Sequence, residues 1–394
     1  GSASTIIRMA EYQTEDTKPY LPGNDFSQVS GTTLDNGLVV TDGTNYWTWV
    51  EVPKTAVFKT ATSETDYTNI EKDMETYTTT GQFDDEGALN LDREGYTDQW
   101  YDYYGASYDG NSQYSQLRIG NATQFNERKE YYGAIYSDST GTTPVESLGS
   151  YSTTYYVKID NKLDDNRGCG LTYSEYNSLK QTMLSSVYRN GGFWIGQYEA
   201  GSEVVIKSNS ELTIPVIKEG AYPYNNITCS DAQIQSSKIN SGNYTSSLMF
   251  GIQWDLVLKH LQVRGKMSVD ELTDDSSDWG NYGNVGFYIT RGEYEEYESI
   301  FYSFTPVPDT GYSKPSSGVL LTTGATERNC KMNIYDLAGN VSECTLEKYT
   351  NSITPCTCRS GFYANDGSYV PASYRSGSST TNSSLDSSFR PALY

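Results

Sequence analysis

The stretches NCKMNIYDLAGNVSECTLE (Asn329–Glu347) and SSFRPALY (Ser387–Tyr394) decide the fold of this chain. Within the first, we predict that Met332–Leu337 is a strand, that Ala338–Asn340 is a tight turn built on Gly and Asn, and that Val341–Leu346 is the returning strand. The second stretch is largely apolar, and we expect it to dock in a core. The segment between the two would then be tied down at both ends.

That intervening segment has an unusual composition. Of the 29 residues from Ser360 to Ser388, 20 are Ser, Thr, Asn, Gly or Tyr, and the only charges are Asp366, Arg375 and Asp386. Such a segment is expected to be mostly loop. The combination of Tyr with Ser, Gly and Asn is also typical of antibody binding loops. A flexible linker has the same composition. Because both ends are anchored, we favour a presented surface over a tether.

The residue types that are missing form a pattern. Lys, Glu, Gln, Met and Trp do not occur from Ser360 to Tyr394. These are the five residues that cannot be reached from the Asn codon AAC by changing its two adenines. A Ser- and Gly-rich loop would lack most of them anyway, so the pattern has weight only together with the resemblance described below.

Length and composition limit the function classes. The 394 residues fit one large domain with an insertion, and 36 tyrosines against 11 phenylalanines suit thin cores and binding surfaces. The formal charge of −22 argues against nucleic-acid partners and anionic membranes. No apolar run reaches membrane-spanning length, and there is no signal peptide. The opening Gly1-Ser2 is typical of a cloning junction, which leaves open a targeting segment upstream.

The first half of the chain is expected to be less regular than the second. Residues 1–45 are interpreted as a short stalk or strand-rich lead-in, and Tyr46–Pro53 as the first convincing strand. Residues 54–189 are polar and acidic, and are interpreted as an insertion with marginal structure, containing a helix at Ser63–Tyr77. The capping box Thr172–Glu175 predicts a helix that continues to about Arg189.

The second half alternates helices and strands. Phe193–Tyr198 is predicted to be a buried strand, Ser230–Ile239 a helix, and Ser246–Leu261 a helix with a broad apolar face. The result is an α+β chain with one ligand-binding domain at 46–394, an insertion at 54–189 and a special C-terminal segment at 359–394.

The order of these pieces resembles the C-type-lectin fold of the formylglycine-generating (sulfatase-modifying) enzymes. That family opens with a strand ending in Val-Pro, as Trp49–Pro53 does, and continues with F-x-I-G-x-Y-E, here Phe193–Glu199. A capping S-x-D-A, a Trp-bearing helix and the turn Y-D-x-A-G-N-V follow. Their counterparts are Cys229–Ala232, the helix around Trp254, and Tyr335–Val341. The resemblance covers roughly 46–53 and 190–394, and implies a C-type-lectin fold with a long insertion.

Departures from the family bear on activity. The oxidising enzymes need cysteines after an R-G-G motif, but here the motif position reads Arg359-Ser-Gly and no Cys follows Cys358. Related iron enzymes need several histidines, whereas His260 is the only one and is expected to be structural. Ser342-Glu343-Cys344 replaces the family's W-E-W. We therefore expect no enzyme activity.

A closer resemblance is to the variable proteins of diversity-generating retroelements, which share this fold and carry a Ser/Asn/Tyr-rich C-terminal repeat. Adenine-specific mutagenesis changes Asn-type codons there, which fits the missing residue types. Pro371–Ser373, Thr380–Ser383 and Phe389–Tyr394 look like the constant framework of such a repeat. The resemblance implies that the variable, ligand-binding positions are Phe362, Ala364, Asn365, Asp366, Ser368, Tyr369, Val370, Tyr374, Ser376, Ser378, Ser379, Ser384, Leu385 and Asp386.

Metal and disulfide expectations are modest. We expect no cofactor. The resemblance, however, places a structural calcium near Asn340 and Glu343. The acidic loops Asp274–Asp278 and Asp84–Glu86 also offer the oxygen ligands that calcium takes. The six cysteines contain no C-x-x-C, so no zinc site is expected. Free buried thiols are favoured over a bridge among Cys330, Cys344 and the Cys356/Cys358 pair.

The sequence thus predicts a non-catalytic protein that binds a protein or cell-surface ligand through a diversified patch, as an adhesin or receptor-binding protein at a cell surface, outside the cell or on a phage virion. A degenerate family enzyme and a purely structural surface protein are the alternatives. Three structural expectations follow. Trp47–Val52 should pair with Phe389–Leu393, and Tyr369, Tyr374, Leu385 and Asp386 should be exposed and close together. Phe389, Arg390 and Leu393 should be buried, with Arg390 paired to an acid or to backbone carbonyls.

Overall fold

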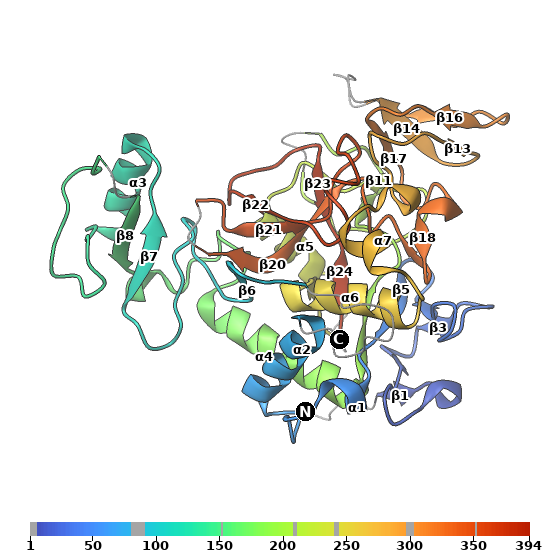
Figure 1. Ribbon diagram of the computed structural model, residues 1–394, viewed down its shortest axis with the longest axis horizontal. Helices are drawn as coiled ribbons and strands as arrows, with labels where there is room; N and C mark the ends of the chain where they lie inside the picture. The colour runs from blue at the N-terminus through green and yellow to red at the C-terminus, as the bar shows by residue number, and fades with distance from the viewer. Residues whose placement is uncertain are drawn as a thin grey trace.

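The computed structural model describes residues 6–79, 91–150, 153–207, 211–239, 244–296, 303–350 and 353–394. It is a mixed α+β structure built around a six-stranded sheet in the order β12-β24-β9-β5-β4-β3 (Figure 1). The strands of this sheet are β3 (Ser27–Gln28), β4 (Val39–Thr41), β5 (Tyr46–Glu51), β9 (Gly192–Gly196), β12 (Ser246–Leu248) and β24 (Pro391–Leu393). All neighbours in it pair antiparallel.

The first and last strands of the predicted domain lie in this one sheet but do not pair. β9 lies between them, with Trp194 opposite Trp49 of β5 on one side and opposite Leu393 of β24 on the other. The indole rings of Trp49 and Trp194 meet edge to face at 4.9 Å. The predicted direct pairing is therefore wrong. The buried F-W-I strand fills the centre of the sheet, where its consecutive apolar residues are covered on both faces.

Residues before β5 are part of the core and do not form a projecting stalk. β1 (Ile7–Arg8) pairs with β2 (Tyr20–Leu21), and β3 and β4 extend the central sheet. Tyr20, Phe26 and Leu38 are buried in the main hydrophobic cluster. The described part of the lead-in thus contributes four short strands, β1 to β4, between Ile7 and Thr41.

The region 54–189 divides into two parts. Two of its helices, α2 (Tyr67–Thr79) and α4 (Tyr173–Asn190), pack against each other and join the core, and α4 begins with the predicted Thr172–Glu175 capping box. The short α1 (Lys54–Val57) precedes them. The hairpin β7 (Tyr114–Arg118) and β8 (Thr154–Lys158), with α3 (Ala122–Tyr132), forms a lobe at the left of Figure 1.

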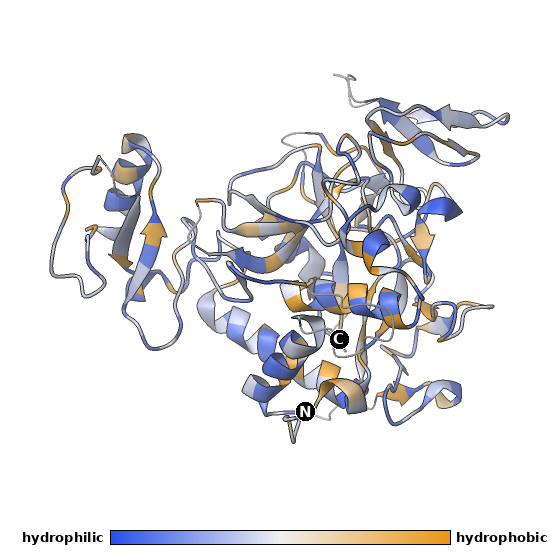
Figure 2. Ribbon diagram, viewed as in Figure 1, coloured by the Kyte–Doolittle hydropathy of each residue, from blue (hydrophilic) through white to orange (hydrophobic). Residues whose placement is uncertain are grey.

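The predicted helix at 246–261 is split in the structure. Ser246–Leu248 form β12 because they pair with β24, and α6 (Gly251–Val263) begins only after Phe250. The carboxylate of Asp98 accepts hydrogen bonds from the backbone N–H groups of Gly251 (2.7 Å) and Ile252 (3.1 Å), where an acid is favoured by the helix dipole. Hydrophobic bands mark α6 at the centre of the molecule (Figure 2), and twelve of its thirteen residues are buried.

A second, five-stranded sheet carries the C-terminal segment. Its order is β22-β21-β20-β23, and β6 also pairs with β20. The strands are β6 (Tyr96–Thr97), β20 (Ser342–Tyr349), β21 (Cys356–Arg359), β22 (Arg375–Ser378) and β23 (Ser387–Phe389). The predicted hairpin of 332–346 is wrong, because β19 (Ile334–Tyr335) pairs with β18 (Cys330–Lys331) while β20 pairs with β21 and, in parallel, with β23.

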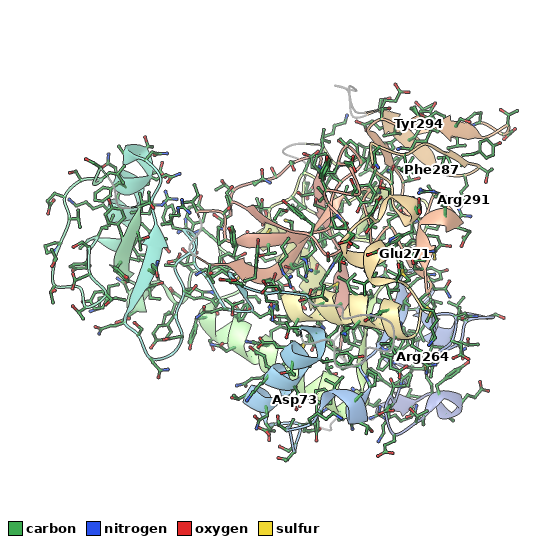
Figure 3. All side chains as sticks on the ribbon, in the orientation of Figure 1. Asp73, Arg264, Glu271, Phe287, Arg291 and Tyr294 are labelled. Atoms are coloured by element: carbon green, nitrogen blue, oxygen red, sulfur yellow. A yellow bond between two sulfur atoms is a disulfide. The ribbon has the colours of Figure 1, made fainter. Side chains whose placement is uncertain are left out.

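Smaller elements cover the two sheets. These are β10 (Gly201–Ser202), β11 (Tyr222–Pro223), α5 (Cys229–Ser237), α7 (Val269–Thr273) and the 3-10 helix η3 (Ser277–Trp279). A group of short strands projects at the upper right of Figure 1: β13 (Phe287–Ile289), β14 (Glu293–Glu296), β15 (Thr305–Pro306), β16 (Tyr312–Lys314) and β17 (Val319–Leu321). Phe287 and Tyr294 are labelled on it in Figure 3, and the ring of Tyr294 stacks on that of Tyr312 at 3.8 Å.

Candidate functional site

The pairing of the five-stranded sheet gathers most of the predicted variable positions at one end. Glu343 of β20 lies opposite Arg359 of β21 and Ser388 of β23, and Arg359 lies opposite Arg375 of β22. β21 therefore ends where β22 and β23 begin. The loop from 360 to 374 and the residues 384–386 emerge at this same end of the sheet, although β22 and the residues after it separate them along the chain.

None of the fourteen predicted variable side chains is buried. Ala364, Ser368, Tyr369 and Tyr374 are exposed, and the other ten are half-buried. Tyr369 exposes 78% and Tyr374 43% of the residue surface, which is rare for large aromatic residues in this structure. These positions can accept other side chains without opening a core.

Most of the residues assigned to the constant framework are buried instead. Phe389 and Leu393 are fully buried and Arg390 is 1% exposed, as predicted. The Arg390 guanidinium donates to Glu343 Oε1 (2.7 Å) and to the backbone carbonyls of Gly196 (2.9 Å) and Tyr335 (2.6 Å). Tyr363, Pro371, Ala372 and Thr380 are buried as well. The exceptions, all assigned to the framework, are Ser373, which is half-buried, and Thr381, Asn382 and Ser383, which are exposed.

Two glycines allow close approaches at this loop, Gly367 to the body of the protein and Gly361 within the loop itself. A Cβ on Gly367 would lie 2.5 Å from Ser277 Oγ, and one on Gly361 would lie 2.7 Å from a methyl of Val370. The Gly367 N–H donates to Asn284 Oδ1 (3.0 Å), and the Gly283 N–H donates to the Asn365 carbonyl (2.8 Å). The loop is thus a docked element, in agreement with the presented-surface interpretation.

Two of the predicted variable side chains also shape this loop. Asn365 Oδ1 accepts from the backbone N–H of Phe362 (2.8 Å), and Asp366 Oδ1 accepts from that of Ser368 (2.8 Å). Such local turns make these positions less free than their exposure indicates. We expect Asn365 and Asp366 to tolerate fewer replacements than Tyr369.

The predicted positions form an extended surface and not one compact cluster. At one side, Phe362 packs edge to face on Tyr363 (5.5 Å), whose side chain contacts Asp386. Tyr374 directly precedes β22 at the other edge of the sheet. Three strand spacings separate it from Asp386, or about 14 Å. Tyr369 and Tyr374 are exposed as predicted, but Leu385 and Asp386 are half-buried, and Tyr374 is not adjacent to Asp386.

The remaining positions run along the edge strand. Ser376 and Ser378 lie on β22 and Ser379 follows it, so Ser378 lies about 13 Å beyond Tyr374 along the strand. Thr380 Oγ1, just beyond them, donates to the carbonyl of Tyr103, which belongs to the insertion at 54–189 (2.7 Å). The insertion therefore flanks this end of the surface.

Sequence reasoning missed a neighbouring apolar group. Val204, Leu212 and Ile214 are exposed at 64%, 42% and 53%. Asn226 joins their loop to the C-terminal segment. Its side chain donates to the Ile206 carbonyl (3.0 Å), and its backbone N–H donates to the Ser384 carbonyl (2.8 Å). Only the apolar residues in an otherwise polar run could have indicated this group.

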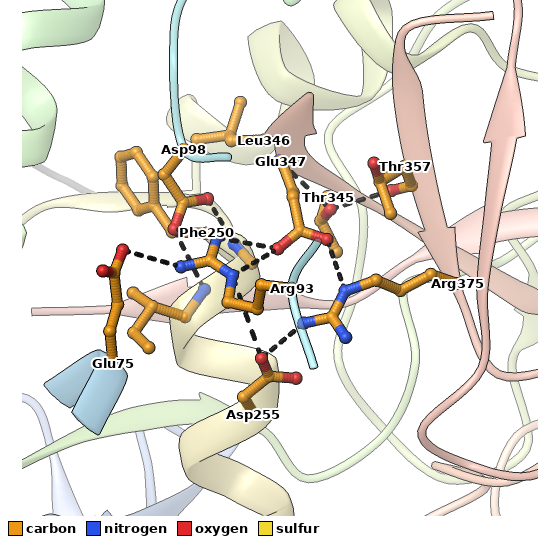
Figure 4. Close-up of polar contacts among 12 residues, drawn as sticks. Glu75, Arg93, Asp98, Phe250, Asp255, Thr345, Leu346, Glu347, Thr357 and Arg375 are labelled. Carbon is orange, nitrogen blue, oxygen red and sulfur yellow. Dashed lines mark hydrogen bonds and ion pairs between the residues drawn. The ribbon is translucent and has the colours of Figure 1, made fainter. Parts of the chain in front are cut away.

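An ion network lies under β22 (Figure 4). Arg375 pairs with Glu347 Oε1 (2.8 Å) and with Asp255 of α6, and Arg93 pairs with Glu347 Oε2 (2.8 Å) and Asp98 (2.9 Å). Although burial disfavours the carboxylate, the guanidinium groups of Arg375 and Arg93 lower the pKa of Glu347 to about 2. The network joins Arg93 and Asp98, which precede the lobe in the chain, to β22, which carries Ser376 and Ser378.

The residues proposed for calcium are engaged with other protein groups. Asn340 Nδ2 donates to Glu199 and to the Leu321 carbonyl (3.0 Å), and Glu343 is paired with Arg390. Asp274 and Asp278 are exposed, while Asp84–Glu86 lie outside the described residues. Nothing in this geometry singles out a calcium site.

The cysteine expectation is wrong. Four of the six cysteines are paired, as Cys229–Cys356 and Cys344–Cys358. Cys169 and Cys330 are free. Spacing along the chain could not show that the start of α5 packs on the sheet opposite Cys356.

His260 is a buried structural residue. It is 4% exposed on α6, and its Nδ1 accepts from the Glu51 N–H (3.2 Å). Burial, assisted by the nearby positive Arg264, lowers the pKa of the imidazole to about 3. This pKa is far below that of an ordinary general base, which lies near neutrality.

This burial predicts an acid sensitivity. The unfolded chain takes up a proton at His260 below about pH 6.5, whereas the folded chain does so only near pH 3. The neutral, buried imidazole therefore contributes its full stabilisation above pH 6.5. Below this pH the free energy of unfolding declines as the pH falls, by up to about 1.4 kcal/mol per pH unit. His260→Gln should weaken this decline between pH 6.5 and 5, measured by urea unfolding. An equal pH dependence in both proteins would show that the imidazole is not buried.

Cavities lie away from the surface of predicted positions. One cavity, of about 850 Å³, is lined by residues such as Ile6, Tyr20, Arg189 and Tyr394. None of the fourteen predicted positions lines it. The candidate site is an open surface and so fits a macromolecular partner better than an enclosed small molecule.

Comparison of the sequence with protein-family models and with curated proteins yields no match. In the ranges that the structure describes, no helix has the length and apolarity needed to cross a membrane.

Proposed function

We propose that this chain is a non-catalytic ligand-binding protein that displays a diversified surface on a C-type-lectin fold of the formylglycine-generating-enzyme type. The observation that carries the proposal is the separation of the C-terminal segment into two sets. All fourteen positions assigned as variable lie at least partly at the surface, while Phe389, Arg390 and Leu393, which follow them in the chain, are buried. A retroelement that changes Asn-type codons needs this arrangement, since surface replacements usually cost within about 0.5 kcal/mol and core replacements far more.

The partner is a protein or cell-surface ligand, engaged at a cell surface, outside the cell or on a virion. Tyr369 and Tyr374 are the aromatic anchors on the surface, with Phe362 at its margin, because binding energy concentrates on aromatic residues. The exposed Val204, Leu212 and Ile214 add a constant apolar border. A C-type-lectin fold is supported by the position of β5 and β24 on either side of β9, which brings the two ends of the domain into one sheet.

Binding tests this function directly. Labelled protein is screened against arrays of proteins and glycans and against intact bacterial cells. For any target found, Tyr369→Ser with Tyr374→Ser should weaken binding at least about 30-fold, the effect of losing one hot spot of about 2 kcal/mol. The melting temperature should stay almost unchanged.

Tyr288→Ser is the matched control, because Tyr288 is exposed at 56% but lies on the projecting strand β13, outside the segment. It should bind as the unmodified protein does. Equal binding by the Tyr369/Tyr374 variant and the unmodified protein would exclude this surface as the ligand site.

A further inference from the structure

Four cysteine sulfurs meet at one point behind the edge strand. Cys229, Cys344, Cys356 and Cys358 place their Sγ atoms all within 4.8 Å of one another, and each residue is at most 5% exposed. Among the described residues, this is the only group of three or more potential His, Cys, Asp or Glu ligands gathered so closely.

Backbone geometry explains the convergence. Cys356 and Cys358 are two residues apart on β21, so their side chains share one face of the sheet. Cys344 lies directly opposite Cys358 on β20 and points to the same face. Cys229 is the first residue of α5, and its bond to Cys356 brings that helix end onto this face.

The cluster fits a tetrahedral thiolate site. Zinc holds four cysteine sulfurs at about 2.3 Å, which places them roughly 3.8 Å apart, within the spacing found here. A structural zinc site is closed, four-coordinate and buried, as these four residues are. Two independent disulfides have no need to converge on one point, whereas four metal ligands must.

Its surroundings favour negative charge. Four thiolates around Zn²⁺ carry a net charge of −2, and the α5 N-terminus that holds Cys229 presents the positive end of the helix dipole. Lys348, opposite Cys356 on β20, is 6% exposed and donates to Ser107 Oγ. Within the described part of the chain, it forms no ion pair.

We propose that Cys229, Cys344, Cys356 and Cys358 bind one Zn²⁺ in the reduced protein, and that the two disulfides are the oxidised form of the same site. Each disulfide gains two electrons and two protons on reduction, either from two thiols, which become a disulfide, or from a phosphine and one water, which become the phosphine oxide. Zn²⁺ then displaces the four thiol protons. The bound ion would fix α5 to β20 and β21 beside Ser376 and Ser378, which lie opposite Cys358 and Cys356 and therefore point to the same face of the sheet. This site is independent of the ligand-binding function proposed above.

Cobalt substitution tests the site on the full chain, reduced with a phosphine under nitrogen and freed of metal. One equivalent of Co²⁺ should produce the visible bands of tetrahedral thiolate coordination, and Zn²⁺ should displace it. If the reduced, metal-free chain has lost structure, Zn²⁺ should restore it, because metal binding and folding are coupled.

Paired variants identify the ligands. Cys344→Ala with Cys358→Ala should abolish the cobalt spectrum while leaving Cys229–Cys356 able to form its disulfide and hold the oxidised fold, checked by circular dichroism. Cys169→Ser with Cys330→Ser, which changes the two free cysteines, should leave the spectrum intact. Failure of Co²⁺ and Zn²⁺ to saturate at one equivalent would overturn the proposal, as would binding that survives the Cys344/Cys358 change or is lost with Cys169 and Cys330.

Discussion

Replacing Arg390 by methionine is expected to lower the free energy of unfolding by about 3–5 kcal/mol, because it leaves a buried charge without its partner. Glu343 is fully buried and receives two hydrogen bonds from this guanidinium, at 2.7 and 3.3 Å. The carbonyls of Gly196 and Tyr335 lose their donors as well. Chemical denaturation at neutral pH measures the change.

Two further variants make the result specific. Arg390→Met combined with Glu343→Leu should recover part of the loss, since removing both members of a buried pair costs less than removing one. Arg167→Met is the surface control, because the Arg167 side chain is 55% exposed and its pair with Asp165 should contribute at most about 1 kcal/mol. A loss of similar size for Arg167 and Arg390 would contradict the buried position of Arg390.

Two phenylalanines of the same segment should respond very differently to truncation. Phe389→Ala removes a ring that is fully buried against Tyr224, and should cost about 3–5 kcal/mol. Phe362→Ala removes a half-buried ring at the surface, and we expect a loss nearer 1 kcal/mol. The two variants share their chemistry and differ in burial, so equal losses would mean that Phe362 belongs to the core.

Local signals in the sequence predicted local structure well. The capping box at Thr172 and the apolar spacing after it gave α4, and the F-W-I run gave β9. The burial of Phe389, Arg390 and Leu393 was also predictable, because a polar loop that returns to an apolar ending must be anchored there. Each of these inferences depends on residues that are neighbours in the chain.

Choices between distant partners could not be predicted in the same way. Ser246–Leu248 has no strand signal of its own, and forms β12 only because β24 offers an edge. Likewise β5 and β24 both have the pattern of paired strands, but nothing local shows that β9 lies between them. The cysteine pairing and the distance of Tyr374 from Asp386 depend on the same long-range arrangement.

The most direct test of a diversified surface is to sequence the DNA that encodes residues 360–394 from many cells of the source population, together with the DNA beside it. We expect substitutions to concentrate in the codons of the fourteen predicted positions, with the codons of Phe389, Arg390 and Leu393 unchanged. A near-copy of this DNA with Asn-type codons at those positions, beside a reverse transcriptase gene, should accompany them. Substitutions spread evenly over buried and exposed codons, with no such copy nearby, would contradict the proposed function.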